Sequence, residues 1–407
     1  MKLTHLGLMA GIALSAMGMA APAFAQVTIK VWSIDGTDRP GIGDVFAKEF
    51  DDANDDITVE YRSIPFDDIV NESLRAFATG NAPDLVSFDN PDFALFSSRG
   101  AMLDITDRVA ASEVIDPANY FQGPLNSVTW DGKLFGVPKY TDTIAVFYNK
   151  DLFAKAGIAE PPKTWAEFTQ YAEQLTDKAN NVYGATFSAR AGEEGTFQFL
   201  PIIQMSGGGY DHVNTDGAVE VLDLWKSMID NGWASRDVLN LGQWDSTGTF
   251  NSGNAAMAVS GPWEIDRMVA DAKFDWGVAL LPTITEGGER SSALGGFNWG
   301  IMANTQHPDE AFRMLEYYVA QDSRIFGEFA NLPARNDIEL PETGIALKDA
   351  ALKVFQEQLQ YARPRGPHPE WQKISKAIYD AMQQALTGQR TSRDALDQAQ
   401  ATIDGIL

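Results

Sequence analysis

The chain is predicted to adopt an α/β fold with mostly parallel sheets, because strand-like and helix-like segments alternate along its 407 residues. Apolar, β-branched runs at 27–34 and 57–64 flank a helical pattern that places Phe46 and Phe50 on one face. A strand, a helix and a strand in this order indicate a β-α-β unit. No repeat, low-complexity tract or Gly/Ser linker interrupts the alternation.

The segments that follow continue the same alternation. A short strand is predicted at 84–88, and an extended run at 143–149 leads into a short helix that Gly157 ends. Thr164 and Glu167 have the spacing of a capping box, which predicts the start of the next helix. Further along, short apolar runs at 277–281 and 300–303 lie between Gly-rich connections.

The C-terminal part is predicted to be helical. Apolar residues recur at spacings of three and four across 308–320 and again from Trp371 to Met382, and Gly388 ends the second of these helices. Thr391 and Asp394 begin a last helix. We interpret the apolar stripes of these helices as faces that pack in the core.

The first 25 residues have the pattern of a cleaved secretory signal peptide. Lys2 precedes an apolar stretch, and the small residues Ala23 and Ala25 predict cleavage before Gln26. The apolar stretch is shorter than the roughly 20 residues that span a bilayer. Because the chain has no cysteine, disulfides and a lipid anchor on a cysteine after the signal are excluded. We therefore expect a periplasmic protein that is not inserted in the membrane.

Charge and motif content narrow the possible functions. The formal net charge of −25 at pH 7 repels nucleic acid, which we therefore do not expect as a partner. The four His are scattered, and no HExxH, CxxC, phosphate-binding P-loop or G-x-S-x-G elbow is present. We expect no metal, no cofactor and no enzymatic activity.

Aromatic residues give a more specific indication. The chain has ten Trp, and several lie beside Gly, Pro or Asp rather than in apolar stripes. Sugars have apolar C–H faces and outward hydroxyls, so a sugar site combines flat aromatic rings with carboxylates, amides and Arg. We expect core positions for Trp165, Trp225, Trp276 and Trp371, and positions near a ligand for Trp32, Trp244, Trp263 and Trp299.

Five segments occur in an order that resembles a known family. They are PDLVSFD at 83–89, GVPKYTDTIAVFYNKDLFAKAGIAEPPKTWAEFT at 136–169, FNSGNAAMAVSGPWE at 250–264, LGGFNWGI at 294–301 and YARPRGPHPEW at 361–371. Their order is similar to that in family 1 extracellular solute-binding proteins, the sugar receptors of bacterial ABC importers. The resemblance covers nearly all of the chain after residue 25.

The resemblance implies a two-lobed periplasmic-binding-protein fold, with a ligand cleft between the lobes and several hinge crossings. Residues 26–140 and 300–355 would form the first lobe, and residues 141–299 and 356–407 the second. It also implies a monomer that captures a carbohydrate by lobe closure and delivers it to the permease subunits of an ABC transporter. No bond would be made or broken.

The resemblance also implies which residues contact the ligand. Asp89 and Asp142 would bind sugar hydroxyls, and Trp263 would stack on a sugar face. Arg363 would reach a hydroxyl or an acidic group. Together with Trp244, the expected set is Trp32, Asp35, Arg39, Ser63, Asp89, Tyr140, Asp142, Trp244, Trp263, Gly295, Gly296, Phe297 and Arg363.

Alternatives stay open at this point. Arg39, Arg363 and Arg365 near the expected cleft are compatible with a sugar acid or a sulfonated sugar, and polyols are a further ligand class. A secreted glycoside hydrolase would use two carboxylates. Its candidate residues are Asp89, Asp142 and Glu264. A binding module without a transport role, such as a chemoreceptor ligand carrier or a surface adhesin, is the remaining alternative.

Overall fold

The fold begins with the β-α-β unit that the hydrophobic pattern predicts. The computed structural model describes residues 26–36 and 41–407, so the expected signal peptide and Arg39 lie outside the described residues. Strands β1 (Val27–Ser33) and β2 (Ile57–Ser63) pair in parallel, with α1 (Ile42–Ala53) between them in the chain. Phe46 and Phe50 of α1 are buried, as their four-residue spacing predicts.

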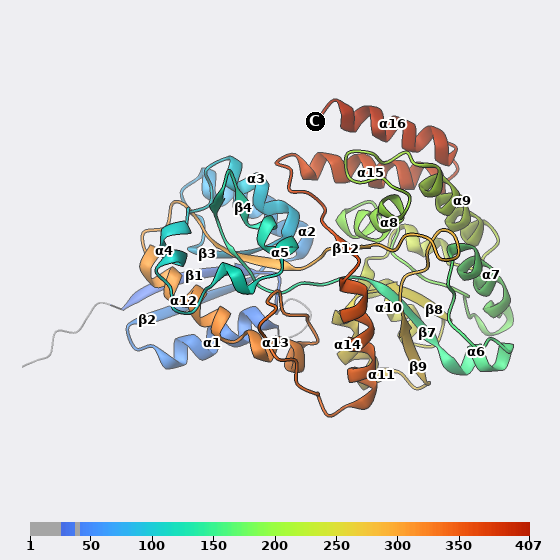
Figure 1. Ribbon diagram of the computed structural model, residues 1–407, viewed down its shortest axis with the longest axis horizontal. Helices are drawn as coiled ribbons and strands as arrows, with labels where there is room; N and C mark the ends of the chain where they lie inside the picture. Colours follow the sequence, from blue (N-terminus) through green and yellow to red (C-terminus); the bar gives the residue numbers. More distant parts are fainter. Residues whose placement is uncertain (1–25, 37–40) are drawn as a thin grey trace, which may run out of the picture.

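The first lobe is built on a five-stranded sheet in the order β2-β1-β3-β11-β6. Strand β3 (Leu85–Asp89) is parallel to β1, whereas β11 (Phe297–Ile301) is antiparallel to β3 and to β6 (Val137–Pro138). A small hairpin joins β4 (Thr129–Trp130) to β5 (Lys133–Leu134). Besides α1, the helices of this lobe are α2 (Phe66–Ala78), α3 (Phe93–Ser98), α4 (Thr106–Ala110), α5 (Gln122–Ser127), α12 (Pro308–Ala320) and α13 (Asp322–Phe329) (Figure 1).

The second lobe contains a three-stranded sheet in the order β8-β7-β9, formed by β7 (Ala145–Asn149), β8 (Met257–Ser260) and β9 (Trp276–Ala279). Its helices are α6 (Lys150–Ala156), α7 (Trp165–Leu175), α8 (Glu193–Met205), α9 (Asp216–Asp230), α10 (Gln243–Asn251), α11 (Ile265–Asp271), α14 (Ala346–Leu359), α15 (Trp371–Leu386) and α16 (Ser392–Asp404). Both neighbours of β7 run antiparallel to it, so the expectation of mostly parallel sheets is wrong for this lobe. The three strands come from distant segments, whose relative direction local apolar patterns do not encode.

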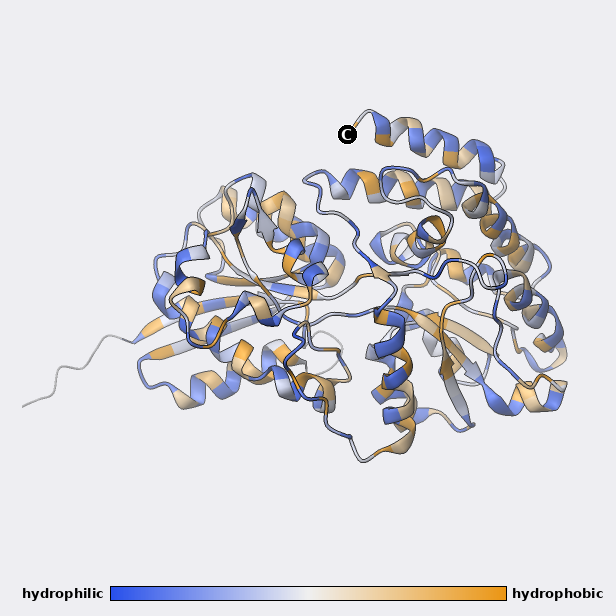
Figure 2. Cartoon of the chain, viewed as in Figure 1, coloured by the Kyte–Doolittle hydropathy of each residue, from blue (hydrophilic) through white to orange (hydrophobic). Residues whose placement is uncertain are grey.

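The helices of both lobes turn an apolar face inward (Figure 2). Trp165, Trp225, Trp276 and Trp371 are among the largest fully buried side chains, which confirms their expected core positions. Trp299 is also buried and stacks on Tyr318 with ring centroids 4.3 Å apart, so the expectation that it lies near a ligand is wrong. On β11 the Trp299 ring faces the helical layer of the first lobe.

Several chain segments cross between the lobes side by side. Asp142 and Gly295 exchange backbone hydrogen bonds of 3.2 and 2.9 Å, and the Thr141 N–H donates to the Leu332 carbonyl at 2.8 Å. β10 (Ser292–Ala293) pairs in parallel with β12 (Ala362–Arg363), and the chain after β10 crosses between the lobes. The packing differs from the expected lobe ranges at two places. Strand β11 starts within the first sheet at Phe297, and α14 packs against β9, β7 and α11 of the second lobe.

None of the helices in the described ranges combines the length and the apolar character that a membrane span needs.

Candidate ligand-binding site

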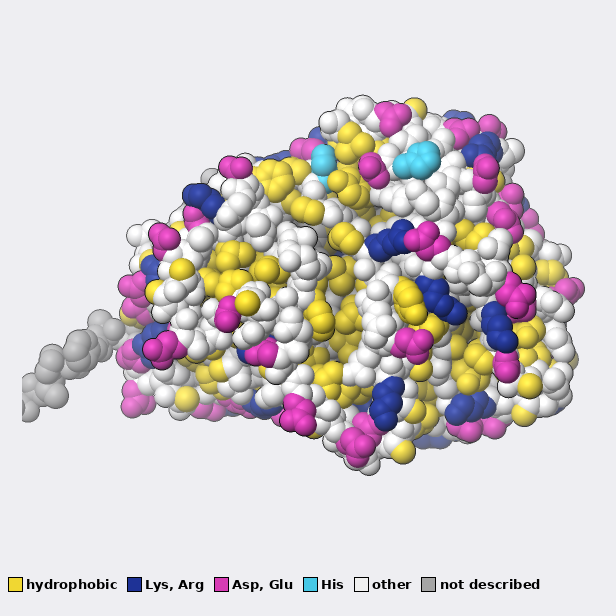
Figure 3. Space-filling model, in the orientation of Figure 1, with side chains coloured by type: hydrophobic (Ala, Val, Ile, Leu, Met, Phe, Trp, Pro, Cys, Tyr) yellow, Lys and Arg dark blue, Asp and Glu magenta, His cyan; other side chains and the backbone are white. Residues whose placement is uncertain are grey.

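A cavity of about 260 Å³ lies where the two lobes and the crossing segments meet. This volume is slightly below the roughly 300–1,000 Å³ of pockets for drug-sized ligands, which favours a small ligand. Figure 3 shows hydrophobic side chains gathered along the boundary between the lobes, on the face in view. The lining combines aromatic rings with carboxylates and comes from both lobes.

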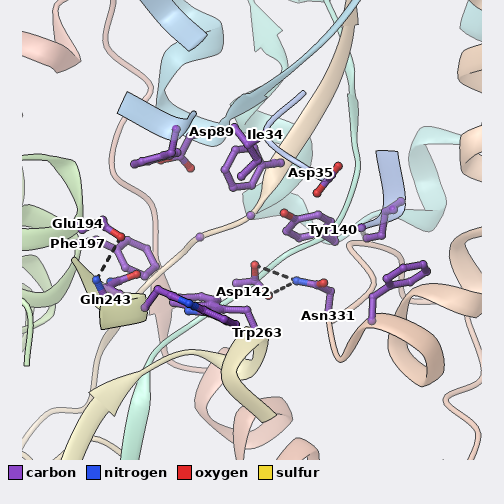
Figure 4. A pocket seen from close by; sticks show the side chains of 18 of the residues that line it. Ile34, Asp35, Asp89, Tyr140, Asp142, Glu194, Phe197, Gln243, Trp263 and Asn331 are labelled. Atoms are coloured by element: carbon purple, nitrogen blue, oxygen red, sulfur yellow. Dashed lines mark hydrogen bonds between the residues drawn. The ribbon is translucent and has the colours of Figure 1, made fainter. Parts of the chain in front are cut away.

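The first lobe contributes carboxylates at the ends of its strands. Asp35 follows β1, and its Oδ2 accepts hydrogen bonds from Ser33 Oγ and from the Gly43 N–H, both at 2.9 Å. The Lys139 ammonium forms an ion pair with the same carboxylate. Burial lowers the pKa of Lys139, although the charge of Asp35 opposes that effect. Asp35 is thus held by its neighbours at the edge of the cavity (Figure 4).

Aromatic rings from the same lobe lie beside these carboxylates. Tyr140 leaves β6 on the first crossing segment, and its ring centroid is 5.7 Å from that of Phe297 at the start of β11. Phe66, at the start of α2, packs edge-on against Phe297 with ring centroids 6.1 Å apart. All three rings line the cavity, so this wall offers flat apolar surface next to hydrogen-bond acceptors.

The second lobe contributes another aromatic wall. Trp263 lies in a short 3-10 turn directly after β8, and its ring centroid is 6.4 Å from that of Phe197 on α8. Trp244, in the first turn of α10, is covered by the Arg267 guanidinium at 3.7 Å from the ring centroid. Arg267 also donates to the Trp244 carbonyl at 3.0 Å, so this ring is fixed from behind. Figure 4 shows Trp263 and Phe197 near one another at the cavity.

The crossing segments close the cavity. Gly296 has a φ of +112°, a conformation that side-chain-bearing residues rarely adopt. A Cβ at this position would lie 2.7 Å from Thr141 Cα and closer still to the Tyr140 carbonyl oxygen, so only glycine allows the two segments to approach this closely. Asn331 donates to both oxygens of Asp142, at 3.2 and 3.4 Å, and orients that carboxylate.

An ionic bridge spans the two lobes at one side of the cavity. Arg365 donates to both oxygens of Asp89 at 2.6 and 2.5 Å, and to Glu193 Oε1 at 2.7 Å. Trp371 Nε1 and Ser375 Oγ donate to the other oxygen of Glu193, at 3.1 and 2.5 Å. Burial favours a lower pKa for Arg365, but the charges of Asp89 and Glu193 outweigh it and raise the pKa above its ordinary value. Asp89 belongs to β3 and Glu193 to α8, so Arg365 ties the lobes together.

The structure brings most of the expected ligand residues together. Nine of them line the cavity: Asp35, Asp89, Tyr140, Asp142, Trp244, Trp263, Gly295, Gly296 and Phe297. Trp32 and Ser63 do not reach it, and the Trp32 ring instead lies under the Arg62 guanidinium at 4.9 Å. Arg363 points away from the cavity, where it donates a hydrogen bond to the Gln204 carbonyl at 3.0 Å and forms an ion pair with Glu289. Arg39 lies outside the described residues.

Sequence reasoning missed several lining residues. Glu193, Gln243, Phe197 and Asn331 line the cavity but were not expected there, and Arg365 was expected near the cleft without being counted among the ligand residues. Glu193 and Gln243 each lie in the first turn of a helix, where polar residues are common for other reasons. Arg365 carried a usable signal, because it lies two residues from Arg363 in the RPR sequence.

No group of three or more His, Asp or Glu side chains that could hold a metal ion is found within residues 26–36 and 41–407.

Comparisons with known proteins agree with this two-lobed fold. The family model of bacterial extracellular solute-binding proteins matches residues 35–324. The galactooligosaccharide-binding protein of Bacillus subtilis is 24% identical, over 86% of this chain and 83% of the relative. A crystal structure of an ABC transporter solute-binding protein from Thermotoga lettingae, bound with alpha-D-tagatose, has a TM-score of 0.82 at 24% identity and covers 94% of this chain and 100% of that chain.

A second solved structure extends the range of bound molecules. It is an ABC transporter solute-binding protein from Agrobacterium vitis with bound D-mannitol, with a TM-score of 0.78 at 20% identity over 93% of this chain and 97% of that chain. These likenesses confirm the predicted two-lobed fold with its ligand cleft.

Proposed function

Because the chain belongs to the family of bacterial extracellular solute-binding proteins, as its sequence motifs predicted, we propose that it captures a carbohydrate or a polyol for an ABC importer. One observation carries this proposal most directly. The cavity is lined from both lobes, with Phe297 and Tyr140 on one side and Trp263 and Phe197 on the other. A ligand held there touches both lobes at once.

The chemistry of the lining suits a polyhydroxylated ligand. The rings of Tyr140, Trp263 and Phe297 can cover apolar C–H faces, which is how aromatic side chains contribute most of their binding free energy. The carboxylates of Asp35 and Asp142 can accept hydrogen bonds from hydroxyl groups, and such charge-assisted bonds are stronger than neutral ones. Aromatic rings and hydrogen-bond acceptors therefore line the same small space.

Lobe closure is the mechanism that we propose for capture. The ligand binds the open form on one lobe, and contacts from the second lobe then form only in the closed form. These additional contacts are the differential affinity that shifts the population toward closure. The crossing strands at 140–145 and 293–297 are the segments that would bend. The closed form would then be recognised by the permease subunits in the periplasm.

A glycoside hydrolase is disfavoured by the positions of its candidate carboxylates. Glu264 is fully buried, bonded to Arg267 at 2.5 Å and absent from the cavity lining, and Asp89 is held by both of its oxygens on Arg365. Neither is placed to act as the general acid of a hydrolase beside a sugar. We therefore expect the mature protein to release no reducing sugar from a panel of glycosides.

A thermal-shift screen tests the capture function. The mature protein is unfolded, refolded to remove any carried-over ligand, and screened against sugars and polyols. A ligand at 100 times its Kd adds about 2.7 kcal/mol to the free energy of unfolding, which gives a clear shift. We expect one chemical class to shift the wild type and to lose its effect in Trp263→Ala. Phe121→Ala is the control, because Phe121 is exposed and outside the cavity. A panel without any shift would refute the proposal.

A further inference from the structure

The charges around the cavity are unevenly distributed. Among the described lining residues, five are acidic, namely Asp35, Asp89, Asp142, Glu193 and Glu194, and Arg365 is the one cation. Three other cations among the described residues lie close behind the lining, and each is held by a carboxylate. Lys139 is buried against Asp35, Arg190 pairs with Glu194 at 3.0 Å and with Asp67, and Arg267, behind Trp244, pairs with Glu264 at 2.5 Å.

Arg365 is engaged by the protein itself. Its Nη1 donates to Asp89 and to Glu193, its Nη2 donates to Asp89, and its Nε donates to the Leu294 carbonyl at 3.3 Å. These bonds use four of the five N–H donors of a guanidinium. The side chain is only 3% exposed, and Phe197 lies against its face at 4.6 Å from the ring centroid. A ligand carboxylate would have to displace a buried ion pair in order to bind it, which is strongly unfavourable.

An anionic group in the cavity would also face the remaining carboxylates at short range. Like charges in a poorly solvated space repel one another strongly, because little water screens them. A hydroxyl group meets the opposite situation, since it donates to a carboxylate without bringing a charge. The same lining therefore favours binding of uncharged, hydroxyl-bearing ligands and disfavours binding of anionic ligands.

Resting on the proposed function, we propose that the cavity selects an uncharged sugar or polyol and rejects sugar acids, and that Asp89 and Glu193 determine this specificity because their two negative charges exceed the single positive charge of Arg365. These two carboxylates are specificity-determining residues through their hold on the guanidinium. Arg365, Asp89 and Glu193 together carry a net charge of −1, and removing one carboxylate brings this cluster to zero, which weakens its repulsion of a ligand carboxylate or sulfonate. The consequence is that a single isosteric substitution weakens the preference for uncharged ligands.

The test uses matched pairs of ligands that differ in charge. Glucose with glucuronate, galactose with galacturonate and mannitol with mannonate are titrated by calorimetry into the refolded mature protein. For the pair whose neutral member binds, we expect the anionic member to bind the wild type at least roughly 100-fold more weakly. Glu193→Gln should narrow that ratio by roughly tenfold or more, because it removes one negative charge beside Arg365 and keeps the side-chain shape.

The control is Glu289→Gln, which makes the same charge change at the partner of Arg363, outside the cavity. It should leave the ratio of the two affinities as in the wild type. Asp89→Asn is the second test variant if Glu193→Gln fails to fold, as judged by circular dichroism.

Three outcomes would overturn the inference. If the wild type binds a sugar acid more tightly than the matching neutral sugar, the inference that the cavity rejects anionic ligands is wrong, but the proposed function of ligand capture is supported. If Glu193→Gln and Asp89→Asn both fold and keep the wild-type ratio, the bridge does not determine specificity. If neither member of any pair binds, the proposed function fails and the inference fails with it.

Discussion

Replacing Gly296 with alanine should damage both the fold and the cavity. A Cβ at this position, where φ is +112°, lies 2.7 Å from Thr141 Cα and closer to the Tyr140 carbonyl oxygen. An L-residue in a left-handed conformation costs roughly 1–2 kcal/mol, and overpacking adds roughly 1–3 kcal/mol. Because the obstacles are backbone atoms, rotation of a side chain cannot relieve them. We expect Gly296→Ala to lower the free energy of unfolding by about 2–5 kcal/mol.

Urea unfolding measures the loss of stability, and ligand calorimetry measures the loss of affinity. The matched control is Gly80→Ala, where φ is +72° and a Cβ would meet no atom within 4 Å beyond the adjacent residues. This variant should lose only the roughly 1–2 kcal/mol of the backbone conformation. Affinity for the ligand should fall at least about tenfold in Gly296→Ala, because Tyr140 is displaced, and stay unchanged in Gly80→Ala. Equal losses of stability in both variants, with affinity intact, would refute this reasoning.

Three further predictions follow from other contacts. Trp263→Ala should weaken ligand binding at least tenfold, or about 1.5 kcal/mol, and calorimetry that finds no change would remove this ring from the site. Asp92→Asn should make the protein more stable than the wild type at pH 8, with a difference that shrinks toward pH 4. Burial and the charge of Asp89 raise the pKa of the Asp92 carboxyl, so the wild type loses stability as the pH rises through that pKa. Thermal unfolding in which Asp92→Asn exceeds the wild type in stability by more at pH 4 than at pH 8 would contradict this prediction. Thr164→Ala should lower the free energy of unfolding by roughly 0.5–2 kcal/mol, because the Thr164 side chain caps α7 by accepting a hydrogen bond from the Glu167 N–H at 3.1 Å. An unchanged midpoint in urea unfolding would contradict this prediction.

Local features of the fold could be predicted because they depend on nearby residues. The capping box at Thr164 and Glu167 is present, and Gly157 adopts the left-handed conformation that ends α6. The direction of the second sheet could not be predicted in this way. It depends on which distant segments pair with β7, and apolar runs of four or five residues carry no information on direction.

The candidate site was predictable to a similar degree. Residues at strand ends and crossings, such as Asp89 and Trp263, reach the cavity because their place in the chain fixes their place in the fold. Arg363 and Arg365 show where this reasoning ends. The two lie two residues apart, yet Arg363 turns to Glu289 while Arg365 enters the ionic bridge at the cavity. Side-chain partners from other segments decide this difference, and one sequence does not contain their positions.

The central claim is that the cavity between the lobes binds one uncharged carbohydrate or polyol and releases it unchanged. Calorimetric titration of the refolded mature protein with the best ligand of the thermal-shift screen, followed by chemical recovery of that ligand, tests it most directly. We predict one ligand bound per chain, recovery of the intact molecule, and loss of binding in Trp263→Ala. Recovery of a cleaved product, or full binding by the Trp263→Ala variant, would contradict the claim.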